Sequence, residues 1–173
     1  TVFCRDLARI VRDPQHSAGM VGTVDAPALS SSALTISEGR FNLFVENPGA
    51  DETRNLRYRM KMHSREGKTY YFSGVKVVHD DPGFDLWHDM TTLFSTIHDG
   101  DGPDAPVLGK GVIHVRLGDF LKQLASMHAT GAQLTVEEQA EALAQFGKFF
   151  GYALLDTYGK VFAGGSHGPV PGS

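Results

Sequence analysis

The sequence predicts a mainly β protein of the α+β class: a curled antiparallel sheet or barrel of about six to eight strands, with a short N-terminal helix and two C-terminal helices. Three observations predict this fold. Apolar and polar residues alternate with a period of two through the middle of the chain. Clusters of Gly, Pro, Asp and Asn interrupt that alternation. After Arg116 the apolar residues recur at helical spacing instead.

The alternation is clearest from Arg54 to His63, where apolar and basic side chains fall on opposite faces of one predicted strand. The apolar face carries Leu56, Tyr58, Met60 and Met62, and the basic face carries Arg57, Arg59 and Lys61, joined by Lys76 of the neighbouring strand. The basic face would either hold an anionic ligand inside a barrel or form a solvated outer face. We expect the outer face, since polar-out strands are the usual antiparallel pattern.

The same reasoning places strands near 23–28, 40–46, 55–63, 69–78, 86–98 and 107–116, all in one antiparallel sheet. Gly74 lies in the middle of the 69–78 strand, where a glycine marks a bend or bulge. Residues 15–22 are expected to form a loop.

Three helices are expected outside the sheet. The first runs from Val2 to Asp13, and the second follows Gly118 and ends at Gly131. The third begins at Thr135, which forms a capping box with Glu138, and continues to Tyr158. Gly147 and Gly151 share one face of this last helix, and they predict a flat seat against the sheet.

Length and composition predict one soluble domain. The chain has 173 residues, 41% of them hydrophobic and 21% charged, and a net charge of -4. This charge gives no general attraction to nucleic acid, and no apolar run reaches the roughly 20 residues that cross a bilayer. A single cysteine, Cys4, excludes an internal disulfide framework. We expect a domain over residues 1–163, a flexible linker-like tail over 164–173, a module cut from a longer polypeptide, and a cytoplasmic location.

Several short motifs carry a resemblance over most of the chain. They are Tyr58-Arg59-Met60, Phe72-Ser73-Gly74-Val75-Lys76, Asp85-Leu86-Trp87-His88-Asp89-Met90-Thr91-Thr92-Leu93, Gly109-Lys110-Gly111, Asp119-Phe120 and Phe146-Gly147-Lys148-Phe149-Phe150. Together they resemble an accessory, non-flavin segment of large cholesterol-oxidase-like flavoproteins of the glucose-methanol-choline oxidoreductase family. The resemblance implies a parent oxidoreductase whose FAD lies in another domain of the same polypeptide. No cofactor is expected here, because Gly109-Lys110-Gly111 lacks the third glycine of a dinucleotide fingerprint and precedes a strand.

No motif for catalysis or metal binding stands out. His88, Asp89 and His114 are acid-base candidates if the chain is a small enzyme working in a barrel mouth. Asp99, Asp101 and Asp104 start like a calcium loop, but Pro103 and Lys110 stand where an EF-hand loop has ligands. We therefore expect solvated turns and no metal.

The expected function is that of a non-catalytic module of a flavin oxidoreductase, holding an apolar lipid or sterol in a barrel. The proposed lining combines aromatic and methionine side chains, which adapt to apolar ligands, with one lysine. It consists of Tyr58, Met60, Phe72, Lys76, Trp87 and Phe94. Two alternatives remain: a small stand-alone enzyme, and a purely structural docking module. An open cavity in the structure favours ligand binding or chemistry, and a filled interior favours docking.

Overall fold

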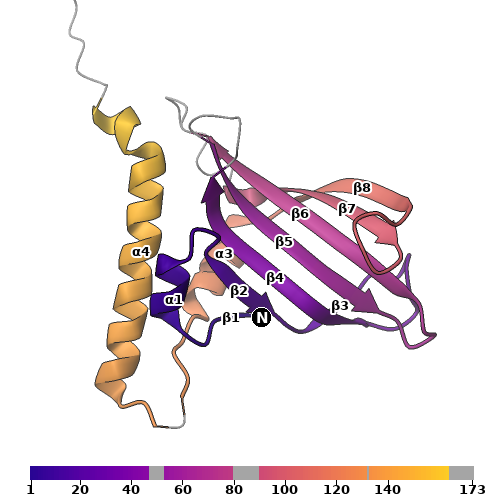
Figure 1. Ribbon diagram of the computed structural model, residues 1–173, viewed down its shortest axis with the longest axis horizontal. Coiled ribbons are helices and arrows are strands. Elements are labelled where there is room, and N and C mark those ends of the chain that lie inside the picture. Colours follow the sequence, from indigo (N-terminus) through magenta and orange to yellow (C-terminus); the bar gives the residue numbers. More distant parts are fainter. Residues whose placement is uncertain (47–52, 80–89, 132, 164–173) are drawn as a thin grey trace, which may run out of the picture.

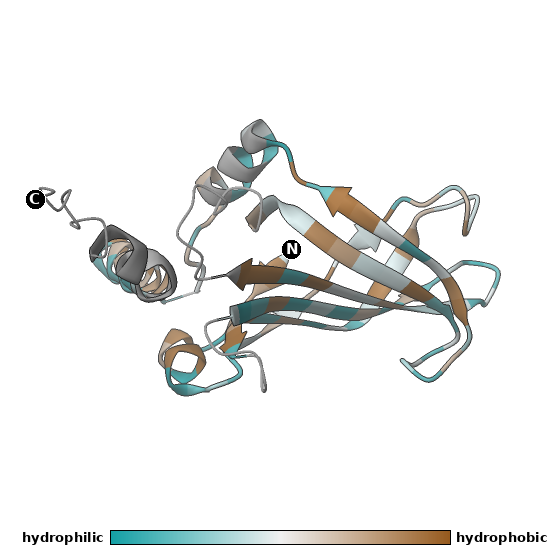
Figure 2. Cartoon of the chain, turned by 90° about the horizontal axis from the view of Figure 1, so that it is seen from above, coloured by the Kyte–Doolittle hydropathy of each residue, from teal (hydrophilic) through white to brown (hydrophobic). Residues whose placement is uncertain are grey.

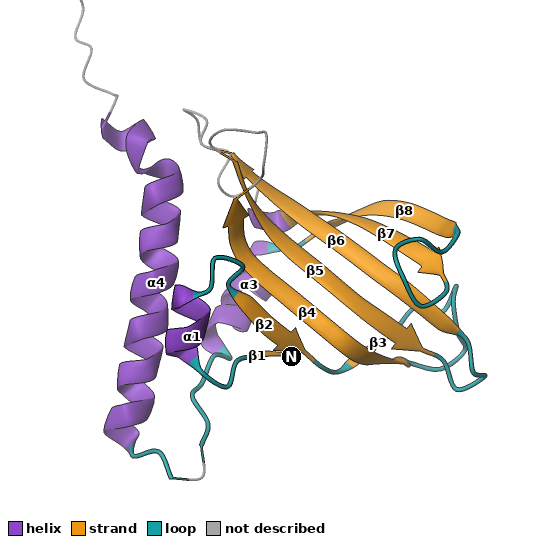
Figure 3. Ribbon diagram, viewed as in Figure 1, coloured by secondary structure: helices purple, strands orange, loops and turns teal. Residues whose placement is uncertain are grey.

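The computed structural model describes residues 1–46, 53–79, 90–131 and 133–163. Its centre is one antiparallel sheet in the order β1-β2-β4-β5-β6-β7-β8, with β3 paired to β4 (Figures 1 and 3). The strands are β1 (Val2–Phe3), β2 (Ser17–Met20), β3 (Thr23–Val24), β4 (Leu34–Glu46), β5 (Thr53–His63), β6 (Thr69–His79), β7 (Thr92–Asp99) and β8 (Val107–His114). The sheet curls, as Figure 2 shows, but β1 and β8 are not paired with each other. The predicted curled antiparallel fold is confirmed, as an open sheet.

The N-terminal segment differs from the prediction. Instead of one helix from Val2 to Asp13, the chain forms β1 and then the short helix α1 (Leu7–Arg12), which Asp6 caps by accepting a hydrogen bond from Arg9 N. The expected loop at 15–22 contains β2, which pairs with β4. Tertiary pairing decides both changes, because a two- or four-residue strand has too little pattern of its own to be read from the sequence.

Strand β4 is longer than expected and irregular. It begins at Leu34, before the predicted 40–46 strand, and its pairing with β5 shifts register twice. Glu38 and Phe44 have positive φ angles of 48° and 51° near these shifts. Such bulges strengthen the twist of a sheet, which accounts for part of the curl. Strand β7 begins at Thr92. Of the earlier part of the predicted 86–98 strand, residues 90–91 are helical and residues 86–89 lie outside the described part of the chain.

The two faces of β5 carry the side chains that the alternation predicts. We call the face that carries Leu56 and Met62 the inner face, and both side chains are buried there. Two core clusters cover it. One comprises Leu43, Phe44, Leu56, Val78 and Met90, and the other comprises Leu34, Met62, Tyr70 and Phe72. We call the opposite face, with Arg57 and Arg59, the outer face.

Helices α3 (Leu117–Ala125) and α4 (Val136–Ala163) complete the fold, and α4 stands beside α1 (Figure 1). The capping box of α4 is present: Glu138 N donates to Thr135 Oγ1, and Thr135 N donates to Glu138 Oε2. Phe150 packs on Phe44, with ring centroids 5.6 Å apart. The predicted glycine seat is wrong, because a Cβ atom at Gly147 or Gly151 would meet no atom within 4 Å in the part of the chain that the structure describes.

Candidate functional site: a groove on the outer face

Strand register brings residues from four strands together on the outer face. In an antiparallel pair, residues directly opposite each other share a face of the sheet. Pairing of β5, β6, β7 and β8 therefore creates two neighbouring rows that cross the strands. The first row is Arg57, Val75, Phe94 and Val112, and the second is Arg59, Ser73, Thr96 and Lys110.

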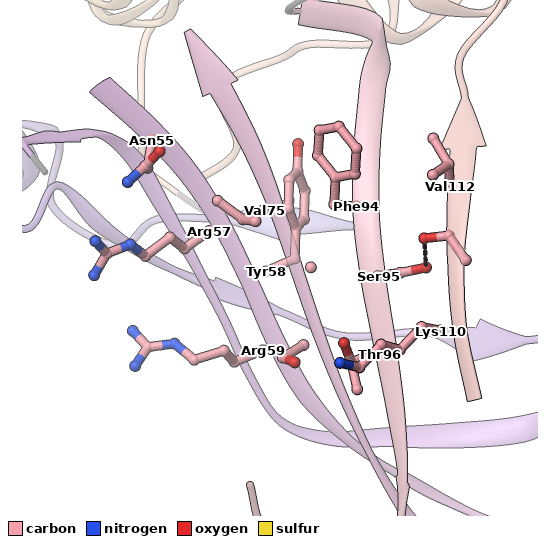
Figure 4. Close-up of a pocket in the computed structure, with 13 residues that line it drawn as sticks. Asn55, Arg57, Tyr58, Arg59, Val75, Phe94, Ser95, Thr96, Lys110 and Val112 are labelled. Atoms are coloured by element: carbon pink, nitrogen blue, oxygen red, sulfur yellow. Dashed lines mark hydrogen bonds between the residues drawn. The ribbon is translucent and has the colours of Figure 1, made fainter. Parts of the chain in front are cut away.

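These two rows line a shallow groove with a volume of about 670 Å³ (Figure 4). Asn55 extends the lining along β5, and Tyr58, Gly74, Ser95 and Gly111 contribute where the strands run between the rows. The side chains of Phe94 and Val112 remain 50% and 51% exposed. The groove therefore has an uncovered apolar stripe across its middle and cationic groups at both ends.

The basic residues of the outer face differ in their partners. Arg59 donates a 2.6 Å hydrogen bond to Asn42 Oδ1, and Asn42 in turn donates to the main-chain oxygen of Gln15. This chain of hydrogen bonds fixes Arg59 without neutralising it. Within the described residues, no carboxylate lies within ion-pair distance of Arg57 or Lys110.

Lys61 lies on the same strand and face but outside the groove. Its Nζ is 2.9 Å from Glu38 Oε1 and 4.0 Å from Asp101 Oδ2. The hydrogen bond to Glu38 raises the pKa of Lys61. Lys61 is thus a paired cation, whereas the groove cations are not paired with acidic residues in the part of the chain that the structure describes.

Asn55 is the most buried polar residue of the lining, at 4% exposure. Its Oδ1 atom is buried and has no hydrogen-bond partner. Buried polar atoms are nearly always paired in folded proteins, so an unpaired one at the end of a groove is a candidate ligand contact.

Lys76 does not join the basic face, contrary to the prediction. It lies opposite Leu56 in the β5–β6 pairing, which places it on the inner face, and it is 7% exposed. Its Nζ donates a 2.8 Å hydrogen bond to the main-chain oxygen of Met90 and lies 5.7 Å from the centre of the Tyr58 ring. Burial lowers the pKa of Lys76 and raises that of Tyr58 to about 12.

The structure separates the other residues predicted to hold a ligand. Phe72 belongs to a core cluster of the inner face, Met60 packs against that cluster, and Tyr58 packs against both clusters. Phe94 lies on the outer face, and Trp87 is outside the described residues. Of the five that the structure describes, only Tyr58 and Phe94 also line the groove.

Among the described residues, the catalytic and metal candidates do not form a site. His88 and Asp89 lie outside the described residues, and His114 on β8 has its Nδ1 3.3 Å from Thr92 Oγ1. Asp99 lies at the end of β7, and Asp101 and Asp104 lie in the turn that follows it. No group of three or more His, Cys, Asp or Glu side chains that suits a metal ion occurs among the described residues.

Sequence reasoning missed the groove because register is a property of strand pairs. The alternation put Arg57 and Arg59 on one face, but nothing within β5 shows that Phe94 and Val112 lie across from them. One signal was available: in a hairpin, residues at equal distances from the turn lie opposite each other. The predicted strand ranges 69–78 and 107–116 were accurate enough for that rule to be applied.

Comparisons with protein-family models, curated proteins and solved structures gave no significant match. None of the described helices combines the length and apolar content that crossing a membrane requires.

Proposed function

We propose that this chain is a non-catalytic accessory module of a larger flavin-dependent, cholesterol-oxidase-like oxidoreductase, and that it binds an apolar small molecule such as a lipid or sterol. The observation that carries the binding role is the stripe of Val75, Phe94 and Val112 across the groove. Two of these side chains are half exposed, and a ligand that covered them would remove apolar surface from water.

The position of the stripe favours the groove over the inner face as the ligand site. Side chains of the two core clusters cover the inner face along β4, β5 and β6, whereas the groove is open to solvent. The described lining offers arginine, lysine, hydroxyl and amide groups but no carboxylate, imidazole or thiol. Such a set suits binding better than acid-base or nucleophilic catalysis.

The oxidoreductase part of the proposal rests on the sequence motifs that resemble the flavoprotein segment. On this view FAD is bound by a neighbouring domain of the same polypeptide, the module has no cofactor, and the protein is cytoplasmic. The chain expressed alone should be colourless. A flavin absorbance spectrum that survives gel filtration would contradict the accessory role.

The binding role is tested by titrating decanol and the fluorescent sterol dehydroergosterol into the chain. We expect Phe94→Ser to abolish binding of at least one of these two neutral probes. Leu108→Ser is the matched control, since Leu108 is 51% exposed on β8 but does not line the groove. Equal binding by both variants, or no binding by the unmodified chain, would contradict the proposal.

A second candidate is docking against the parent domain, and strand β8 favours it. All eight residues of β8 are exposed, and β8 ends the sheet. Val107, Leu108 and Ile113 are each about half exposed. An apolar edge strand is a ready template for pairing with another strand. Protection of the β8 amides from hydrogen exchange in the longer protein, compared with this chain alone, would support docking.

A further inference from the structure

We infer that the ligand of the groove is an amphipathic anion: a molecule whose carboxylate, sulfate or phosphate head binds Arg57 and Arg59, and whose apolar tail lies across Val75, Phe94 and Val112. The inference rests on the proposed binding role and adds the chemistry of the head group.

The first step is the pair of arginines. Arg57 and Arg59 are two residues apart on β5, so both project from the outer face. Figure 4 shows the two side chains extending side by side from the β5 end of the groove, on the side away from Phe94 and Val112. Two guanidinium groups present a fork of N–H donors that matches the oxygens of a carboxylate, sulfate or phosphate.

The second step is the state of these charges. Arg57 has no acidic partner in the described residues, and Arg59 is held by the neutral amide of Asn42. The chain as a whole is acidic, with a net charge of -4, and the neighbouring Lys61 does have a carboxylate partner. Two adjacent cations left without a counter-charge beside an apolar stripe are complementary to an anion that also carries a tail.

The third step is the length of the stripe. The first row crosses three strand-to-strand spacings from Arg57 to Val112, which is about 14 Å at roughly 4.8 Å each. A medium-length alkyl chain fits this distance when its head is at Arg57. Lys110 reaches toward Thr96 from the far side (Figure 4), where it can contact a second polar group of a longer ligand.

The test compares three probes with the same tail and different heads: decanoate, decanol and decyltrimethylammonium. Each is titrated by calorimetry into the chain at low and at moderate salt. We expect decanoate to bind at least tenfold more tightly than decanol, with an affinity that falls as salt rises. The cationic probe should bind more weakly than decanol.

Two variants locate the head group. The double change Arg57→Gln and Arg59→Gln should reduce decanoate affinity about tenfold or more and leave decanol affinity unchanged. Lys61→Gln removes a cation from the same strand and face but outside the groove, and it should leave decanoate affinity unchanged. Far-ultraviolet circular dichroism confirms that each variant is folded.

The outcomes separate this inference from the proposed function. Equal affinity for decanoate and decanol overturns the anionic head and leaves apolar binding in place. An equal loss of decanoate affinity with Lys61→Gln also overturns it, because the effect is then one of general charge. If no probe binds, both the inference and the binding role are overturned.

Discussion

The Nζ atom of Lys76 donates a hydrogen bond of 2.8 Å to the main-chain oxygen of Met90, at a position where Lys76 is 7% exposed. Lys76 lies opposite Leu56 of the core in the β5–β6 pairing, and its Nζ lies 5.7 Å from the centre of the Tyr58 ring. A buried ammonium group loses its hydration, so the folded state favours the neutral amine. This explains why the pKa of Lys76 is lowered.

Replacing Lys76 with Met should therefore change how stability depends on pH. Between the lowered pKa and the ordinary lysine value near 10.5, the unfolded chain binds more protons than the folded chain at this residue. The free energy of unfolding contributed by Lys76 then rises with pH across that range. We expect Lys76→Met to be more stable at pH 7, by on the order of 1 kcal/mol, with an advantage that shrinks toward about pH 10.

Urea unfolding at several pH values measures this difference. Lys122→Met is the control, because Lys122 is an exposed lysine whose side chain retains 81% exposure. A constant difference between Lys76→Met and the unmodified chain from pH 7 to about pH 10 would show that the buried amine does not change its proton affinity on folding.

Tyr58 should have the opposite effect at higher pH: its contribution to the free energy of unfolding should fall as pH rises. Burial raises its pKa to about 12, compared with 10.0 for a free tyrosine. The folded state keeps the phenolic proton that the unfolded state releases, so this stabilisation is complete below about pH 10 and is lost between about pH 10 and 12. Tyr58→Phe should lose less stability than the unmodified chain between about pH 9 and pH 11. Urea unfolding at these two values tests the prediction, and parallel losses in both proteins would contradict it.

These two residues also show what the sequence could predict. Alternation within β5 placed Tyr58 with Leu56 and Met62, and all three pack in or against the core. The period of two within the 69–78 strand puts Lys76 on the face of Phe72, and the pairing of Lys76 with Leu56 agrees. Grouping Lys76 with the basic face failed because charge was given more weight than the period of the strand.

The remaining features of the fold and the groove depend on contacts between segments that are far apart in the sequence. The register shifts between β4 and β5 arise where Glu38 and Phe44 adopt positive φ angles. Neither glutamate nor phenylalanine is a residue type that predicts a positive φ angle. The groove depends on the register of four strands, and its apolar stripe joins residues 75, 94 and 112. The open edges of the sheet follow from which strands pair, so the sequence could not distinguish a curled sheet from a barrel.

The close approach of β2 to β4 gives a test of the pairing between these two strands. Gly39 lies opposite Met20, and a Cβ atom there would overlap the main-chain oxygen of Met20. Because backbone cannot move aside as a flexible side chain does, Gly39→Ala should destabilise the fold by about 1–3 kcal/mol. Gly109→Ala is the matched strand control, since no atom lies within 4 Å of its added Cβ. Similar urea midpoints for the two variants would contradict the β2–β4 pairing.

The final prediction concerns Gly147, in the interior of α4. The space around its added Cβ is open, so the methyl group of Gly147→Ala meets nothing, while alanine favours the helix by roughly 1 kcal/mol over glycine. We expect more helical signal at 222 nm and a higher thermal midpoint if α4 unfolds with the sheet. Gly147→Leu should act in the same direction, because no described atom lies within 4 Å of the added Cβ.

Gly74→Ala is the control for a glycine that does have neighbours. Its added Cβ would lie 3.0 Å from both Leu93 Cδ1 and Phe72 Cε1, so we expect a lower midpoint. A fall in midpoint for Gly147→Leu comparable to that of Gly74→Ala would mean that the glycine face of α4 packs against the rest of the chain. A rise instead leaves Gly147 and Gly151 on a bare helix face that another domain can approach closely, which is how the docking role would use them.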